Sequence, residues 1–236
     1  MQLMRLLLGP PGSGKTSRLL SALRPRLRQG AANFRLLAPT ATLRGHLANS
    51  LAREGLLVRP SSIDTLHGFL ASLVPSLQPA SPEDLRFLTA QALDELQPPA
   101  LPATPHLPSA LARAMDELAA AGCGPAQWDA LGSLRLWEGP RFHAFGALSE
   151  RTDSLLARAG LSRRSALLAA ATRHIASHGL PSLDDLFLDG FFTFSPFELQ
   201  LLETLARHTR LHITLPEWSG ARDAVERLRR AGLHLE

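Results

Sequence analysis

A glycine-rich segment near the start of the chain has the residue types of a phosphate-binding loop. It reads Gly9-Pro10-Pro11-Gly12-Ser13-Gly14-Lys15-Thr16 and lies between an apolar run, Leu3–Leu8, and a helix-like segment, Ser17–Leu23. Glycines let the backbone turn tightly and direct several N–H groups at one phosphate, where the positive end of the following helix dipole also lies. The order strand, glycine loop and helix therefore predicts a P-loop that binds a nucleoside triphosphate.

Two side chains of this loop have expected roles. Lys15 is placed to reach the β- and γ-phosphates, and the Thr16 hydroxyl is placed to hold Mg²⁺. Lys15 is the only lysine in the chain, at a position where a compact ammonium suits better than a planar guanidinium. We expect ATP and Mg²⁺ as cofactors, with ATP bound by Gly9, Pro10, Pro11, Gly12, Ser13, Gly14, Lys15, Thr16 and Ser17.

A P-loop also needs a carboxylate on a neighbouring strand, which holds Mg²⁺ through water. Asp189 directly follows the apolar run Leu186-Phe187-Leu188 and is in the expected place. The sequence therefore predicts Thr16 and Asp189 as metal ligands, and Lys15 and Asp189 as the catalytic residues.

The residue that activates water in many ATPases is missing from its usual position. A glutamate usually follows the metal-binding aspartate, but Gly190 and Phe191 follow it here. Glu198 and Glu217 are the candidate substitutes, yet Glu198 is also predicted to cap a helix, as the last residue of the capping box that begins at Ser195. The metal ligand is present, and an obvious general base is not.

Both ends of the chain alternate between strand and helix patterns, which predicts an α/β fold with a parallel sheet and helices on both faces. Elements are expected at Leu3–Leu8, Ser17–Leu23, Phe34–Ala38, Thr40–Arg53, Ile63–Thr65 and Leu66 onward, and then at Arg163–Ser177, Leu186–Asp189, Ser195–Arg207, Leu211–Leu215 and Asp223–Ala231.

The middle of the chain has a different pattern. Residues 78–82 and 97–108 are dense in proline, which marks linkers. The other segments show helical patterns without strands, so residues 79–160 are predicted to form an all-helical insertion between the two α/β parts, residues 1–78 and 161–236. The expected helices are Glu83–Leu96, Ser109–Ala121, Gln127–Leu134 and Arg141–Gly160.

Composition narrows the class of protein. The 236 residues carry a net charge of +4, and residues 1–60 hold ten lysine and arginine residues but one acid, Glu54. Such a segment suits a polyanionic partner, and arginine-rich solvated helices are the alternative explanation. The single cysteine, Cys123, excludes an intrachain disulfide and a cysteine-built metal site. There is no secretory signal pattern and no apolar stretch of about 20 residues, so we expect a cytoplasmic protein.

Several motifs together resemble the first motor domain of superfamily 1 helicases of the UvrD/Rep type. They are the glycine loop, Ala38-Pro39-Thr40 at a strand end, Asp-Thr-Leu-His-Gly-Phe at 64–69, and the segment 186–199. The Asp-Gly-Phe and Phe-Ser-Pro-Phe-Glu runs most resemble AddB/RexB, the helicase-like nuclease subunit of bacterial complexes for double-strand-break repair and recombination. The resemblance implies a RecA-like ATP-binding domain, residues 1–78 and 161–236, with residues 79–160 as its inserted helical subdomain.

The resemblance also implies partners. Pro39, Thr40, Thr65 and His67 match helicase motifs that contact single-stranded DNA, and their hydroxyls, imidazole and adjoining helix N-termini can donate to phosphate. A turn that caps itself is the alternative explanation of Thr65 and His67. An AddA-like helicase–nuclease is the implied partner subunit.

The chain departs from the pattern of this family at two points. Superfamily 1 motors carry a second acid after the aspartate, whereas AddB-type proteins lack it and are regarded as DNA-scanning or structural modules. Family members also continue into a second motor domain, which supplies arginine fingers, and into a nuclease domain with an iron–sulfur cluster. We therefore expect a fragment or short gene product that binds ATP and hydrolyses it weakly or not at all.

Three other functions fit a P-loop. An AAA-type ATPase uses a similar loop but favours Asp-Glu at the second motif, where this chain has Asp189-Gly190. A small-molecule kinase would carry a basic lid over the phosphates. A protein-interaction module with a vestigial nucleotide site would need no such additions.

Overall fold

The computed structural model describes residues 4–102, 104–133, 139–180, 182–230 and 232–235. Leu3, Leu134 and Ala231, each at the end of a predicted element, lie outside the described residues. The chain forms two compact units, one made of Met1–Leu73 with Ala170–Glu236 and the other of Val74–Ala169. The sequence pattern predicts divisions at 78/79 and 160/161. Here they fall at 73/74 and 169/170, the second inside a continuous helix, α8 (Arg164–His178).

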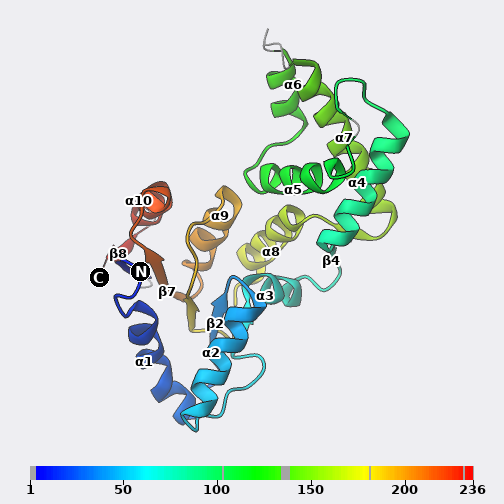
Figure 1. Cartoon of the computed structure of the whole chain (residues 1–236). Coiled ribbons are helices and arrows are strands. Elements are labelled where there is room, and N and C mark those ends of the chain that lie inside the picture. The colour runs from blue at the N-terminus through cyan, green and yellow to red at the C-terminus, as the bar shows by residue number, and fades with distance from the viewer. Residues whose placement is uncertain (1–3, 103, 134–138, 181, 231, 236) are drawn as a thin grey trace. The chain divides into compact units, whose positions relative to one another are not determined.

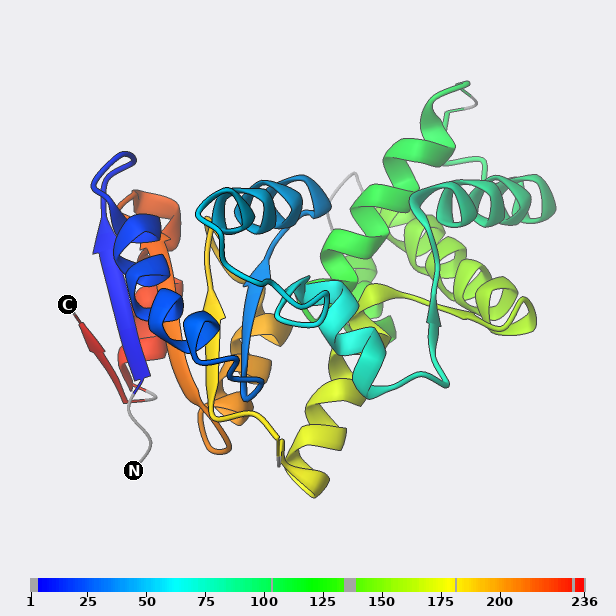
Figure 2. The same ribbon diagram turned by 90° about the horizontal axis from the view of Figure 1, so that it is seen from below.

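The first unit is built on a parallel sheet, whose strands lie in the order β3-β2-β6-β7-β1-β8 within the described residues. The order can be followed in Figure 2, from β8 at the left through β1, β7 and β6 to β2. The parallel α/β fold predicted from the sequence is confirmed. The strands are β1 (Met4–Gly9), β2 (Phe34–Ala38), β3 (Ile63–Thr65), β6 (Asp185–Leu188), β7 (Arg210–Pro216) and β8 (Leu233–Leu235).

Strand β8 is absent from the sequence-based expectations. It pairs in parallel with β1, from Met4 opposite Leu233 to Leu6 opposite Leu235. Three residues are too few to show the alternation that marks a strand, so the backbone pairing of β8 is visible only in the folded chain.

Helices cover both faces of this sheet (Figure 1). On one face lie α1 (Lys15–Arg28) and α2 (Ala41–Arg53), and on the other lie α9 (Pro196–Leu205) and α10 (Arg222–Arg230). The unit also contains α3 (Leu66–Leu73), the end of α8 and a short 3₁₀ helix, η1 (Ser219–Ala221). Leucines four residues apart turn one side of a helix toward the sheet, as Leu47 and Leu51 of α2 do. Burial of each such leucine contributes about 2 kcal/mol.

Helix α1 extends further than its sequence pattern predicts. It continues to Arg28, past the expected end at Leu23 and through Pro25. A proline inside a helix removes one backbone hydrogen bond. Leu27, beyond the proline, is buried in the same cluster as Leu23, and its burial offsets part of that loss.

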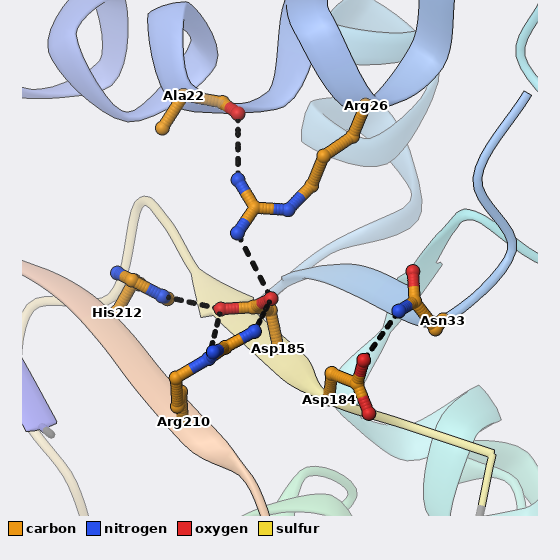
Figure 3. Close-up of polar contacts among 7 residues, drawn as sticks. All are labelled: Ala22, Arg26, Asn33, Asp184, Asp185, Arg210 and His212. Carbon is orange, nitrogen blue, oxygen red and sulfur yellow. Dashed lines mark hydrogen bonds and ion pairs between the residues drawn. The ribbon is translucent and has the colours of Figure 1, made fainter. Parts of the chain in front are cut away.

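The amino edge of the sheet is held by a buried carboxylate (Figure 3). Asp185, the first residue of β6, is 2% exposed and accepts hydrogen bonds from Arg210, His212 and Arg26 at 2.7–3.0 Å. Burial alone would raise the pKa of Asp185, but these donors lower it to about 2. The His212 ring stacks on Phe187 with 4.4 Å between centroids, and burial lowers the pKa of His212. The cluster therefore joins α1, β6 and β7 through one charge.

In its described residues, the second unit is helical apart from one short pair of strands. Strands β4 (Gln78–Pro79) and β5 (Leu161–Ser162) pair in parallel, an addition to the predicted all-helical segment. Apolar side chains of α4, α5 and α7, among them Leu88, Met115 and Leu148, form its core. The helices are α4 (Pro82–Leu96), α5 (Leu107–Ala120), α6 (Pro125–Ser133), α7 (Gly139–Arg158) and the start of α8.

Candidate nucleotide site

The predicted nucleotide site lies at the carboxyl edge of the sheet. Because the paired strands are parallel, the loops that follow β1, β2, β3, β6 and β7 all emerge at this edge. Adjacent strands β1 and β7 are followed by helices on opposite faces, α1 and α10. Ligands of open α/β sheets bind in the crevice that such a reversal creates.

The glycine loop adopts a geometry that other residues disfavour. Gly12 has φ of 80° and Gly14 has φ of 82°, in the left-handed region that glycine enters without steric cost. A Cβ at Gly9 would lie 2.9 Å from Ser13 Oγ. Each glycine of the motif therefore answers a local steric requirement.

The N-terminus of α1 carries no side-chain cap. Its N-cap is Gly14, and its first turn contains no acid. By contrast, α2 is capped by Thr40, whose oxygen accepts from Leu43 N at 3.2 Å, and α9 begins with a Ser195–Glu198 capping box. An uncapped helix start behind a glycine loop is the arrangement that favours an anion.

The Lys15 ammonium lies over the loop. Its Nζ donates to Gly9 O at 2.6 Å, to Pro10 O at 2.7 Å and to Ser13 Oγ at 3.2 Å. These three acceptors match the three donors of an ammonium. They hold the only lysine of the chain at the mouth of the loop, where a phosphate would meet it.

The two halves of the predicted metal site meet directly. Thr16 Oγ1 donates to Asp189 Oδ1 at 3.1 Å, and Thr214 Oγ1 donates to the same oxygen at 2.6 Å. Asp189 is 2% exposed, and its backbone N–H donates to Leu37 O at 3.1 Å. Sequence analysis identified Thr16 and Asp189 but missed Thr214, whose signal is one hydroxyl within the apolar run Leu211–Leu215.

These residues fit a magnesium ion. Mg²⁺ takes oxygen ligands and is usually bound by one or two protein groups together with substrate phosphates and water. The Thr16 hydroxyl keeps its oxygen lone pairs while its hydrogen bonds Asp189 Oδ1. Within the described ranges there is no cluster of three or more potential histidine, cysteine or carboxylate ligands that would bind a metal without such phosphates.

Packing explains why no glutamate follows Asp189. Gly190 has φ of 83°, and a Cβ at this position would lie 2.2 Å from Leu43 Cδ2. A longer side chain would therefore adopt a strained backbone conformation and force the Leu43 side chain to shift.

The two candidate substitute bases have other contacts in the described part of the chain. The Glu198 carboxylate accepts from Ser195 N at 2.8 Å, which confirms its predicted capping role. Glu217 is exposed, and its backbone N–H donates to Gly9 O at 3.0 Å. Glu217 thus lies beside the start of the loop, held there through its backbone.

The four predicted DNA-binding residues lie at the same edge, at or just after the ends of the neighbouring strands β2 and β3. Pro39 and Thr40 follow β2 and Thr65 ends β3, with Ala38 opposite Thr65 in the register. The Thr65 hydroxyl accepts from Gly68 N at 2.9 Å, so Thr40 and Thr65 both cap helices. Capping uses a lone pair of the oxygen and leaves the hydroxyl hydrogen to donate. His67 is exposed in the first turn of α3.

No helix in the described part of the chain combines the length and apolar character needed to cross a membrane. Comparison of the chain with models of protein families and with curated proteins found no match.

Proposed function

We propose that this chain binds Mg-ATP at the Gly9–Thr16 loop and single-stranded DNA at the adjoining part of the same sheet edge. In this proposal it is the helicase-like, RecA-type part of an AddB-like subunit that works with an AddA-like helicase–nuclease in double-strand-break repair. The observation that carries the nucleotide assignment is the Thr16–Asp189 hydrogen bond. It joins the two motifs that a P-loop requires, although they lie far apart in the sequence.

The loop residues have distinct tasks in this proposal. The loop N–H groups and the uncapped start of α1 hold the phosphates. The Lys15 ammonium exchanges the neutral oxygens of Gly9, Pro10 and Ser13 for phosphate oxygens, because hydrogen bonds to a charged acceptor are stronger. Thr16 and Asp189 would hold Mg²⁺, which would neutralise part of the phosphate charge.

Binding without fast hydrolysis follows from the same residues. Hydrolysis needs a group that orients and deprotonates water, and Gly190 has no side chain to do so. The second need is a cation that stabilises the transition state, which in superfamily 1 motors comes from a second motor domain. The chain is therefore proposed to sense or hold ATP more than to consume it.

Strand order supports the DNA assignment. The residues after β2 and β3 occupy one side of the edge, and the loop after β1 occupies the other, with β6 and β7 between them. A phosphate backbone at Thr40, Thr65 and His67 would thus run beside the nucleotide. The proposal implies a cytoplasmic location, where bacterial DNA lies.

Isothermal titration calorimetry with Mg-ATP tests the proposal. The wild-type chain should bind ATP, and Lys15→Ala should weaken binding by about 100-fold, the value of a strong hydrogen bond to a charged group. Arg53→Ala, an exposed change on α2, should bind as the wild type does, and circular dichroism should show both variants folded. Equal affinity of the wild type and Lys15→Ala would exclude the loop as the site.

A further inference from the structure

A hydrogen bond to Asp189 accounts for the buried hydroxyl of Thr214 in the interior of the sheet. Thr214 is 3% exposed on β7, the strand between β1 and β6. Its neighbours in sequence, Ile213 and Leu215, are fully buried. A hydroxyl in such a position is costly unless it is hydrogen-bonded, and the Thr214 hydroxyl donates to Asp189 Oδ1 at 2.6 Å.

Strand register places this contact. Leu188 of β6 lies opposite Ile213 of β7, so the next residues, Asp189 and Thr214, are neighbours across the ladder. On its other side, Thr214 lies opposite Leu7 of β1, two residues before Gly9. Thr214 is therefore on the strand that separates the glycine loop from the predicted metal-binding carboxylate.

The two hydroxyls that donate to Asp189 differ in burial and in the element that carries them. Thr16 is exposed, in the first turn of the helix that would hold phosphate. Thr214 belongs to an interior strand that is hydrogen-bonded on both sides. Two donors on one carboxylate oxygen restrict rotation of the carboxylate, and the contact from β7 does not depend on the position of the loop.

We infer that Thr214 is a positioning residue for magnesium at the proposed nucleotide site, an inference that rests on the proposed function. Its hydroxyl fixes the orientation of the Asp189 carboxylate, so that this carboxylate is already aimed when Mg-ATP arrives. Thr214 does not touch phosphate in this role. Its loss should weaken the contribution of Mg²⁺ to ATP binding and leave the contacts of ATP with Lys15 and the loop in place.

The quantity to measure is the coupling between Mg²⁺ and ATP, which equals the ratio of ATP affinities with and without the metal. Fluorescent N-methylanthraniloyl-ATP is titrated into the whole chain, once with excess Mg²⁺ and once with EDTA. Thr214→Val removes the hydroxyl at nearly constant volume. It should lower the ratio by about 10-fold or more, as expected for one hydrogen bond to a charged group, and change affinity in EDTA by less than about twofold.

Two further variants separate positioning from packing. Thr214→Ser keeps the hydroxyl and should restore the ratio to within about threefold of the wild type. Thr204→Val removes another buried hydroxyl of the same unit, which donates to Gln200 O at 2.9 Å, and should leave the ratio unchanged. Should Thr214→Val not fold, Thr214→Ala also removes the hydroxyl, and a ratio equal to that of the wild type in that variant would overturn the inference.

The possible outcomes distinguish the two proposals. A wild-type chain that binds the fluorescent nucleotide in neither condition refutes the proposed function. A wild type that binds with clear magnesium coupling, together with a Thr214→Val variant whose coupling is unchanged, refutes the role of Thr214 alone. Equal losses of coupling in Thr214→Val and Thr214→Ser would also refute it, because the hydroxyl would then not be the group that matters.

Discussion

The Thr16 hydroxyl donates to Asp189 Oδ1 at 3.1 Å, although 173 positions separate the two residues. Much of that interval is the second unit, Val74–Ala169. The contact forms because α1 starts at the carboxyl end of β1 and Asp189 follows β6. Only strand β7 lies between β1 and β6 in the sheet. The relationship makes the glycine loop and the carboxylate one site.

We expect the purified chain to hydrolyse ATP barely above background. A positioned general base contributes ~10²–10⁴-fold, and an arginine finger contributes ~10³–10⁵-fold in related chemistry. Gly190 cannot supply the first, and the second is expected from another domain. Phosphate release with and without single-stranded DNA measures the rate.

Turnover of about 1 s⁻¹, at the low end of ordinary enzymes, would contradict this expectation if Lys15→Ala abolished it. Glu217→Gln would then be the first variant to examine, because the Glu217 backbone contacts Gly9 O. A rate that persists in Lys15→Ala would instead indicate a contaminating ATPase.

Gly190→Glu should destabilise the fold and restore no hydrolysis. Overpacking against Leu43 and the left-handed backbone together should cost about 1–3 kcal/mol of unfolding free energy. Urea denaturation measures it. The matched pair is Gly190→Ala and Gly30→Ala: Gly30 has φ of 68° with no atom within 4 Å of its Cβ position. Equal losses in the two alanine variants would show that the Leu43 contact is not limiting.

Single-stranded DNA should bind weakly and with strong salt dependence. For single strands, log K falls with log salt at about −0.7 per neutralised phosphate. Fluorescence anisotropy of a labelled oligonucleotide gives this slope. His67→Ala should lower the affinity several-fold, whereas His178→Ala should not, because His178 is exposed before β6 at the opposite edge of the sheet. Absence of binding at low ionic strength would remove the DNA assignment for this chain.

Stability should fall in two steps as the pH decreases. The pKa of His212 is lowered from 6.5, so its contribution is present above pH 6.5 and is lost as pH falls below that value. The pKa of Asp185 is lowered from 3.8 to about 2, so its contribution is present above pH 3.8 and is lost toward pH 2. The second step corresponds to about 2 kcal/mol of unfolding free energy.

Denaturant unfolding at several pH values measures both steps. Asp185→Asn should remove the step below pH 3.8 and lower stability at pH 7, because Arg26 and Arg210 lose the charge they share. Asp184→Asn changes the exposed carboxylate next to it and serves as the control. An unaltered acid profile in Asp185→Asn would mean that the cluster in Figure 3 does not govern acid stability.

Local sequence determined the parts whose causes are local. Glycines that must turn with positive φ, Ser195 with Glu198 as a capping box, and leucines at helical spacing such as Leu47 and Leu51 each show their role within a few residues. The strand before Asp189 was also predicted correctly, because a short apolar run bounded by polar residues is typical of a buried strand. These features were sufficient to predict the α/β class, the loop and its carboxylate.

Tertiary structure decided the parts that depend on which strands become neighbours. Thr214 acquires its role only because the register sets it beside Asp189. The close approach of Leu43 of α2 to Gly190 likewise depends on the packing of two distant segments. The pairing of β8 with β1 and the convergence of three donors on Asp185 depend on the same kind of contact. The energy of such contacts comes from burial and hydrogen bonding between segments that are distant in the sequence. These contacts produce no periodic pattern within either segment, so the sequence alone does not reveal them.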